Sequence, residues 1–598
     1  MPGDTITRRF HDTAERQGDR AALKYRDGED WAEISWTGYA EAVREVAMGL
    51  AALGVRPGQA VAILSRNRPE WHIADIGAMC AGAITVPVYT TSSPSQVAYI
   101  AGHSDASVIL VENEEQLLKV EKERSELPAL RHAVVLDDYP ESADGFALSF
   151  AVLRERGRAY DAEHPGEYEE RWQAPSPEDV ATIVYTSGTT GPPKGAMLTH
   201  SNAVWTVGSL LQVFDEPFGT GRRLSFLPLS HIAERVTSHM SQVVNGIETW
   251  FAESLDTVLR DLQACRPTVF FAVPRVWEKF YAGIQARLAG LPEEQRQAAE
   301  GAVYVSTAVV EMRQAGDEPI EEMTHGLHEA EEKMFGPLRA ALGLDQCTYF
   351  VSGAAPINAE ILKFFHAVNM PIAEVYGQTE GTGPTSLNPR DRIKIGTVGP
   401  PIPGVEVRIA EDGEILVRGG NVFPGYFKNP EATAEMLADG WMHTGDVGEL
   451  DEDGYLKITD RKKDLIITAS GKNVAPQELE NALKYHPLIS QAVVIGDRRP
   501  YLVALITLDQ EALPKFAADR GIAETDPAAL AEHAEVQAAV AAAVASVNAE
   551  FSRAEGIKRW KVLSRDFLME AEEITPTLKV RRRAIVQKFA PDIEDLYS

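Results

Sequence analysis

Hydrophobic runs and amphipathic segments alternate through the first part of the chain. Short apolar runs are typical of buried strands, and longer segments with apolar residues three or four positions apart are typical of helices. Such alternation predicts a mainly parallel sheet with helices on its faces. Ser93 followed by Pro94 is a typical helix start. The expected elements are a helix at 36–53, a strand at 60–64, a helix at 71–81, and strands at 84–88 and 107–111.

The pattern changes in the middle of the chain. Residues 112–178 are charged and contain prolines, and we expect them to be peripheral. Residues 290–343 are polar and rich in Glu and Ala, which predicts a helical insertion. Asp412-Gly413 lies between two runs that alternate in period two, which predicts a β-hairpin. The expected strands are at 405–409 and 414–418, with further strands ending in polar turns within 348–356 and 372–380.

A smaller unit is expected at the C-terminus, with a helix at 476–485 and strands at 491–495 and 501–506. At 598 residues the chain exceeds what one hydrophobic core usually holds. The pattern predicts an α/β fold whose large domain combines mainly parallel sheets, flanked by helices, with a β-rich subdomain. A small α+β domain is expected to follow it at the C-terminus.

Composition narrows the class of partner. The net charge of −30 disfavours binding of nucleic acid, whose phosphates need a basic surface. The three cysteines, Cys80, Cys265 and Cys347, lie far apart, so neither a disulfide framework nor a zinc site is indicated. The N-terminus shows no signal-peptide core, and no window of 18 apolar residues occurs. We expect a cytoplasmic protein whose contact with a membrane, if its substrate is a lipid, is peripheral.

A strand-like run at 180–185 leads into a segment rich in glycine and hydroxyl groups, Tyr185-Thr-Ser-Gly-Thr-Thr-Gly-Pro-Pro-Lys-Gly195. Glycines let the main chain approach a ligand, and convergent N–H groups form an anion nest. The segment lacks the Gly-Lys-Ser/Thr of a Walker A loop. A flexible linker would explain the glycines but not the preceding strand. The segment therefore predicts a phosphate-binding loop with candidate ligands Thr186, Ser187, Gly188, Thr189, Thr190 and Lys194.

This loop resembles the phosphate loop of the adenylate-forming, AMP-binding superfamily, and other motifs of that superfamily follow in order. Tyr376-Gly377-Gln-Thr379-Glu380 matches its Tyr-Gly-x-Thr-Glu motif. The resemblance implies that Tyr376 stacks on adenine, that Thr379 contacts the α-phosphate, and that Glu380, with Thr186, holds Mg²⁺. A carboxylate beside a phosphate loop also suits a hard cation on chemical grounds. Taken alone, a capped turn would explain the same residues.

Further matches extend the implied nucleotide site. Gly353 and Ala354 lie in Ser-Gly-Ala-Ala-Pro, which resembles the loop on the adenine side. Asp446, at the end of Trp-Met-His-Thr-Gly-Asp, would accept hydrogen bonds from the ribose hydroxyls, and Arg461 would also reach the ribose. Surface turns would explain each of these segments in isolation.

The C-terminal segment carries the parts that the resemblance implies to be mobile. Lys463 takes the position of the hinge of the small domain, which implies a large domain at 1–460 and a small mobile domain at 461–598. Gly471 lies in the loop on the coenzyme A side. Lys579 takes the position of the adenylation lysine. Leu578 replaces the glycine usual before that lysine, a pattern common in the long-chain branch. Without the resemblance, Lys579 and the arginines after it would be interpreted as a solvated basic tail.

The resemblance implies a two-step reaction. A carboxylate attacks the α-phosphorus of ATP and pyrophosphate leaves, and the thiol of coenzyme A then displaces AMP from the acyl-adenylate. Lys579, Thr186 and Glu380 are the expected catalytic residues, because charge on the phosphates must be neutralised in the transition state. No nucleophilic side chain is needed, so positioning and electrostatics would carry the catalysis.

Subfamily patterns resemble the long-chain acyl-CoA synthetases, in the segment 271–279, in the helical insertion and before Lys579. His231 would border the acyl pocket. Arg235 stands where some relatives have a tryptophan gate, so gating is not carried over. The expected partners are ATP, coenzyme A and a fatty acid, with Mg²⁺ as cofactor. The alternatives are a fatty acyl-AMP ligase that loads a carrier protein, a ligase for another carboxylic acid, and a non-catalytic binding relative.

Overall fold

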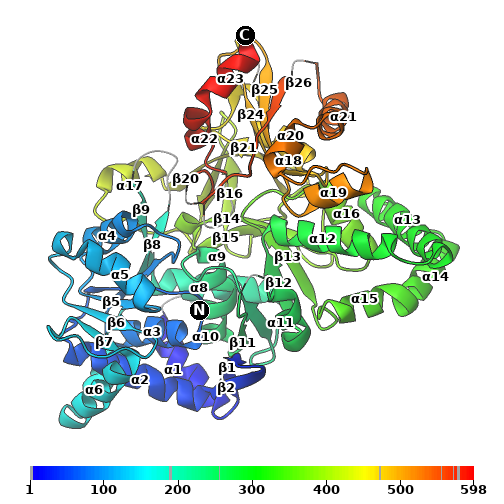
Figure 1. Cartoon of the computed structure of the whole chain (residues 1–598). Coiled ribbons are helices and arrows are strands. Elements are labelled where there is room, and N and C mark those ends of the chain that lie inside the picture. The colour runs from blue at the N-terminus through cyan, green and yellow to red at the C-terminus, as the bar shows by residue number, and fades with distance from the viewer. Residues whose placement is uncertain are drawn as a thin grey trace.

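The computed structural model of the protein describes residues 4–186, 192–254, 256–469, 473–553, 555–569, 571–575 and 580–598, with only the main chain of Asn473. A broad body of four sheets carries a smaller lobe, which contains the C-terminus at the top of Figure 1. No helix in these described ranges is long and apolar enough to cross a membrane.

The largest sheet has eight strands and confirms the parallel arrangement expected for the first part of the chain. β3 (Ala60–Leu64) is buried along its whole length, as expected for a strand with helices on both faces. Val61 and Ile63 contribute to one core, with α2 (Trp36–Ala52) and α3 (Pro69–Cys80). Ala62 and Leu64 contribute to another, with α4 (Pro94–His103) and α5 (Glu114–Lys122). From edge to edge the strands are β18 (Gly425–Tyr426), β9 (Lys194–Thr199), β8 (Val180–Thr186), β4 (Ile84–Val88), β3 (Ala60–Leu64), β5 (Val108–Val111), β6 (His132–Val135) and β7 (Ala147–Ser149), and the pairs β18–β9 and β9–β8 are antiparallel.

The expectation that residues 112–178 are peripheral was wrong. This segment supplies β6 and β7 of the main sheet and three α-helices, which are α5, α6 (Phe150–Glu163) and α7 (Glu167–Gln173). α6 lies against α2 so closely that a Cβ at Gly157 would be 1.8 Å from the carbonyl oxygen of Glu45. Charged residues such as Arg154 dominate the composition of these helices, so the sequence pattern did not reveal that Leu153 is buried.

The chain begins with α1 (Ile6–Gln17), which is followed by an antiparallel hairpin that joins a second sheet. Its strands, in spatial order, are β10 (Arg222–Ser225), β11 (Glu248–Phe251), β1 (Ala21–Asp27) and β2 (Asp30–Ser35).

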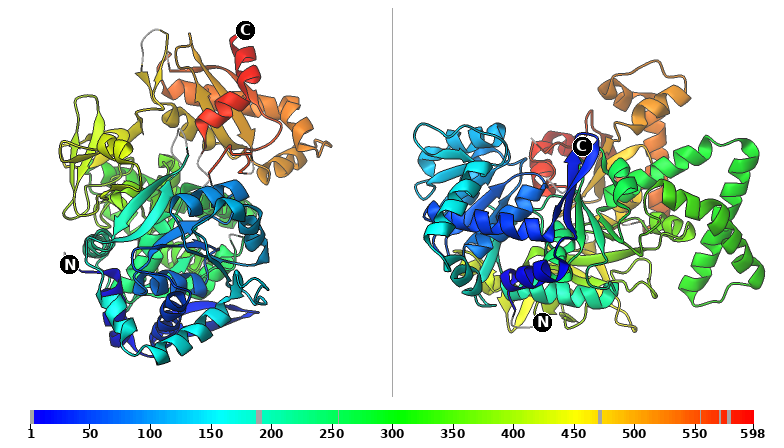
Figure 2. Two further views of the ribbon diagram at one scale, coloured as in Figure 1. Left: turned by 90° about the vertical axis from the view of Figure 1, so that its left-hand side faces the viewer. Right: turned by 90° about the horizontal axis from the view of Figure 1, so that it is seen from below.

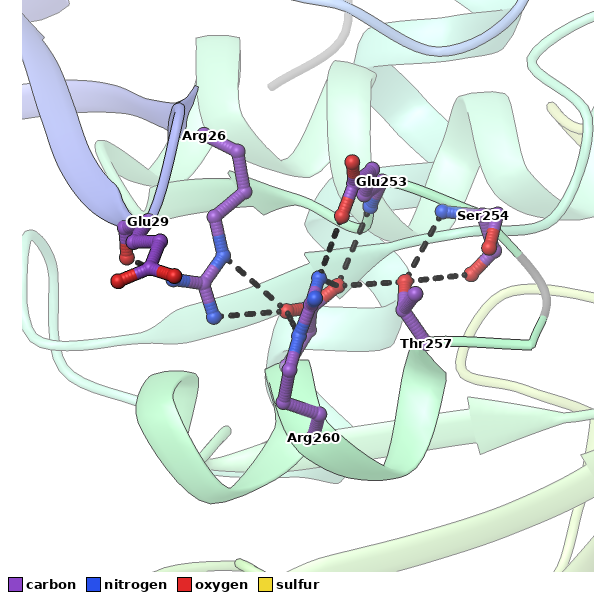
Figure 3. Close-up of polar contacts among 7 residues, drawn as sticks. Arg26, Glu29, Glu253, Ser254, Thr257 and Arg260 are labelled. Atoms are coloured by element: carbon purple, nitrogen blue, oxygen red, sulfur yellow. Dashed lines mark hydrogen bonds and ion pairs between the residues drawn. The ribbon is translucent and has the colours of Figure 1, made fainter.

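Polar contacts tie this hairpin to α11 (Val258–Cys265), as Figure 3 shows for the residues around Arg26. Arg26 donates from Nη2 to the Oδ1 atom of the buried Asp261 (3.0 Å), and Thr257 donates to Oδ2 of the same residue (2.8 Å). Burial raises the pKa of Asp261, but hydrogen bonds from Arg260 and Thr257 outweigh it and hold that pKa below its usual value. The carboxylate therefore stays charged and fixes the end of the sheet.

A third sheet forms one wall of the site described below. α12 (Pro274–Ala289), α16 (Ala359–Ala367) and the helical insertion cover one of its faces, where Trp277 and Phe365 are buried. The insertion is helical, as expected, and projects to the side of the body in Figure 2. The strands are β12 (Val269–Ala272), β13 (Tyr349–Gly353), β14 (Ile372–Gln378) and β15 (Gly383–Leu387), and the insertion contains α13 (Glu293–Ala315), α14 (Glu321–Ala330), η3 (Glu331–Phe335) and α15 (Gly336–Ala341).

The predicted β-hairpin around Asp412-Gly413 is present, and Gly413 has a positive φ of 85°. It belongs to a sheet of five strands, β16 (Glu406–Ile409), β17 (Glu414–Arg418), β20 (Trp441–Leu450), β19 (Leu437–Ala438) and β21 (Leu456–Arg461).

The smaller lobe has its own core around a three-stranded sheet. Val536, Val540, Val544 and Val547 are buried on one face of α21 (Ala534–Glu550), as their helical spacing predicts. The strands are β24 (Ile489–Ile495), β25 (Leu502–Leu508) and β26 (Ile557–Val562), and the other helices are α18 (Pro476–Lys484), α19 (Ala512–Asp519), α20 (Pro527–Glu532), α22 (Arg582–Lys588) and α23 (Ala590–Tyr597).

Candidate active site

A cavity of about 1930 Å³ lies where the third and largest sheets meet the smaller lobe. Most of the site residues expected from the sequence line it, although they come from distant parts of the chain. Gly353, the last residue of β13, is not among the lining residues, although its neighbours Ser352 and Ala354 are. Ser187, Gly188, Thr189, Thr190, Gly471 and Lys579 lie outside the described residues. Those that line the cavity are Thr186, Lys194, His231, Ala354, Tyr376, Gly377, Thr379, Glu380, Asp446, Arg461 and Lys463.

The candidate phosphate loop connects two antiparallel strands, β8 and β9. Thr186 and Lys194 face each other as the last pair of this ladder, and the Thr186 hydroxyl donates to the Lys194 carbonyl (3.4 Å). Tyr99 on α4 donates to the Pro193 carbonyl (3.0 Å) and anchors the base of the loop. The hairpin therefore places a hydroxyl and an ammonium group at the cavity wall.

The polar end of β14 contributes a second set of groups. A Cβ at Gly377 would lie 1.7 Å from the Gly383 carbonyl oxygen, so only glycine fits this approach to β15. The chain then makes a short turn that contains Thr379 and Glu380, both nearly buried. Tyr426 donates from Oη to Glu380 Oε1 (2.6 Å), which fixes the orientation of that carboxylate.

Asp446 is held at the cavity wall by two neighbours. Asp446 and Arg461 are partners in the β20–β21 ladder, with Arg461 Nε 3.5 Å from Asp446 Oδ1. Tyr376 donates from Oη to Asp446 Oδ2 (2.6 Å). Burial and the charge of Asp446 raise the pKa of Tyr376, so the phenol remains a donor. The three residues that the sequence assigns to adenine and ribose thus form one connected group.

Glu374 is a cavity residue that the sequence analysis missed. It is the register partner of Ser352, and both Glu374 Oε2 and Ser352 Oγ are buried without a hydrogen-bond partner among the described residues. Burial raises the pKa of Glu374 to about 8, although the Gly396 amide opposes the shift. A glutamate within the apolar run Ile-Ala-Glu-Val was the available sequence signal, because buried charged residues are rare.

Part of the cavity lining consists of apolar side chains from one hydrophobic cluster, and this part is called the apolar arm. Val236 belongs to η2 (Arg235–Met240), a π-helical turn that forms part of this arm. Arg235 points into the core, where Nη2 lies 2.9 Å from Asp75 Oδ1, so it is a buried ion pair rather than a gate. Apolar side chains that line the arm are Leu210, Phe214, Val236, Val269, Phe271 and Val351.

The smaller lobe contributes the segment next to Lys579. Arg582 makes a bidentate contact with Glu480 (2.6 and 2.8 Å) and donates to the Val494 carbonyl (2.6 Å). This arginine, which a basic-tail interpretation would leave in solvent, anchors the segment that lines the cavity at Val580 and Arg581. On the body side, Asp460 accepts from the Gln477 amide at the start of α18 (3.2 Å).

The residues suit a cation that arrives with a nucleotide. No cluster of three His, Cys, Asp or Glu side chains with metal-binding geometry occurs in the part of the chain that the structure describes. Mg²⁺ commonly binds through one or two carboxylates together with substrate phosphates. Glu380 beside Thr186 and Lys194 fits that mode.

Two lobes around a cavity with a hydroxyl-bearing hairpin and fixed carboxylates define the class of adenylate-forming enzymes. The chain belongs to the AMP-binding enzyme family: residues 10–427 match the model of the AMP-binding enzyme and residues 463–598 match the AMP-binding enzyme C-terminal domain.

Curated relatives and solved structures agree with this assignment. The chain is 40% identical over 580 residues to the long-chain-fatty-acid–CoA ligase FadD15 of Mycobacterium bovis, covering 95% of this chain and 93% of that protein. It is 34% identical to the long-chain-fatty-acid–CoA ligase ACSBG2 of Xenopus laevis, covering 100% of this chain and 84% of the relative. The adenylation domain of a carboxylate reductase from Mycobacterium chelonae has the same fold, with a TM-score of 0.72, 24% identity and coverage of 100% and 92%.

Proposed function

We propose that the protein is a long-chain-fatty-acid–CoA ligase. It would activate a fatty acid with ATP to an acyl-adenylate, release pyrophosphate, and transfer the acyl group to coenzyme A with release of AMP. The observation that carries this proposal is that one cavity contains both the apolar arm and the groups around Thr186, Glu380 and Asp446. The FadD15 and ACSBG2 relatives support the choice of a long-chain acid.

Each part of the cavity has a role in this proposal. Tyr376 and the Gly353–Ala354 turn hold adenine, Asp446 and Arg461 hold ribose, and the hairpin at Thr186 and Lys194 holds phosphate together with Ser187, Gly188, Thr189 and Thr190. His231, which also lines the cavity, would border the acyl pocket. Thr379 and Gly377 bring the main chain to the α-phosphate.

The second half-reaction requires another arrangement of the lobes. We assign residues 1–460 and 461–598 to two domains that rotate about Lys463, so that Lys579 acts in adenylation and Gly471 faces coenzyme A afterwards. Arg275 and Asp509, and Lys279 and Glu511, form ion pairs across the lobes. Both pairs would break during rotation: Lys279–Glu511 is exposed and therefore weak, whereas Arg275–Asp509 is partly buried.

Mg²⁺ bound with ATP would neutralise phosphate charge, and Glu380 and Thr186 are the residues that would hold it. The chain's own residues would orient the reactants. They would also exclude water, because the apolar arm and the turn at Glu380 are largely buried. The enzyme would act in the cytoplasm and meet membranes only peripherally.

The test is pyrophosphate release by the purified protein with ATP, Mg²⁺ and a panel of acids from acetate to stearate. Dependence on palmitate and formation of palmitoyl-CoA are expected. Acylation of a carrier protein in place of coenzyme A would instead identify an acyl-AMP ligase. A preference for short or aromatic acids would reject the long-chain assignment.

A further inference from the structure

Tyr426 joins two parts of the site that no motif connects. Its Oη donates to Glu380 Oε1 (2.6 Å), and its ring lies 5.1 Å from the Lys194 ammonium. Glu380 belongs to the turn after β14, whereas Lys194 starts β9. The side chain is 5% exposed and lines the cavity.

The main chain fixes this side chain firmly. β18 pairs with β9, with Tyr426 opposite Ala196, so Tyr426 is part of the sheet that carries the phosphate hairpin. The Tyr426 amide donates to Thr433 Oγ1 (2.9 Å), and the Phe423 amide donates to the Glu380 carbonyl (2.9 Å). The segment 423–426 therefore holds Glu380 at both its side chain and its main chain.

The hydrogen bond from Tyr426 engages one of the two carboxylate oxygens of Glu380. The Tyr426 hydroxyl donates to Oε1 alone among the two carboxylate oxygens of Glu380 in the hydrogen bonds of the described residues. A donor on Oε1 restricts the orientation of the carboxylate, so that Oε2 can serve as a ligand. An ammonium above the ring face is held by a cation–π attraction.

We propose that Tyr426 is a positioning residue for metal-bound ATP. Its hydroxyl orients Glu380 toward a divalent cation, and its ring orients Lys194 toward the phosphates. The inference rests on the proposed function, and it adds a residue that couples the metal-binding carboxylate to the phosphate hairpin.

The experiment measures binding rather than turnover. ATP binding to wild type and Tyr426→Phe is measured calorimetrically, once in EDTA and once across a Mg²⁺ titration without fatty acid. Tyr426→Phe loses a hydrogen bond to a charged group but keeps the ring. The Mg²⁺ concentration that gives half of the Mg²⁺-dependent gain in ATP affinity (the Mg²⁺ midpoint) is therefore expected to rise about tenfold, while ATP binding in EDTA stays unchanged. Tyr426→Leu, which also removes the ring, is expected to weaken binding in EDTA as well.

Two further variants separate positioning from loss of structure. Tyr39→Phe removes another buried phenol hydroxyl, which donates to the His72 carbonyl (3.2 Å) in the core, and should leave the Mg²⁺ midpoint unchanged. In a Glu380→Gln background, Tyr426→Phe should have little further effect on the midpoint, since both act through one carboxylate.

An unchanged midpoint in Tyr426→Phe would overturn the inference, as would an equal loss of ATP binding with and without Mg²⁺. Additive effects of Tyr426→Phe and Glu380→Gln would also overturn it. A wild-type protein that binds no ATP would reject the proposed function itself, so the two failures are distinguishable.

Discussion

Asp446→Asn, read out with ATP analogues, tests the assignment of the ribose site. The Asp446 side chain is 11% exposed and is oriented by Tyr376 Oη at 2.6 Å and Arg461 Nε at 3.5 Å. Asparagine keeps the size of the side chain but loses the charge and one acceptor. Since a hydrogen bond to a charged group contributes about 1.5–3 kcal/mol, each such contact with a ribose hydroxyl corresponds to roughly ten- to hundredfold in affinity.

The assay compares the dissociation constants of ATP and 2′,3′-dideoxy-ATP for both proteins. Wild type is expected to bind the dideoxy analogue at least tenfold more weakly than ATP. Asp446→Asn is expected to bind ATP about tenfold more weakly than wild type, yet to distinguish the two nucleotides by less than threefold, because the partner of the hydroxyls has already been weakened. Equal discrimination by both proteins would refute the role of Asp446 in ribose binding.

Three other predictions concern stability and the half-reactions. Because the pKa of Glu374 rises from 4.5 to about 8 on folding, the free energy of unfolding of wild type should fall as pH rises from about 5 to 8. In Glu374→Gln this fall should be smaller by a few kcal/mol. Identical pH profiles of urea unfolding in the two proteins would contradict this. Asp75→Asn leaves the fully buried Arg235 without its counter-charge and should cost about 3–5 kcal/mol in urea unfolding, whereas Arg418→Ala, at an exposed ion pair, should cost less than about 1 kcal/mol; equal costs would argue against a buried pair. Lys579→Ala should abolish adenylate formation yet retain thioester formation from supplied acyl-AMP, and equal loss of both half-reactions would reject its role.

Elements with strong local patterns could be predicted from the sequence. The strand at 60–64 has the predicted bounds, since a run of five apolar residues between turns is too short for a helix and suits a buried strand. Ser93 and Pro94 begin α4 with a capping box, and Asp412-Gly413 forms its hairpin. Local chemistry specifies each of these features, so no distant contact was needed to anticipate them.

The features that the sequence did not reveal depend on distant contacts. Tyr426 lies 46 positions from Glu380 in the chain, and tertiary contacts such as the pairing of β18 with β9 bring them together. The position of Arg582 depends on Glu480 in another element. Residues 112–178 looked peripheral because their composition is dominated by the outward faces of α6 and α7, while a few small and apolar residues form the buried contacts.

The most direct test of the account is to follow both halves of ATP during incubation with palmitate and Mg²⁺ in the absence of coenzyme A. The account predicts palmitoyl-adenylate and pyrophosphate in equal amounts, with conversion of the adenylate to palmitoyl-CoA and AMP when coenzyme A is added. Formation of ADP and phosphate, or the absence of any palmitate-dependent cleavage of ATP, would contradict it.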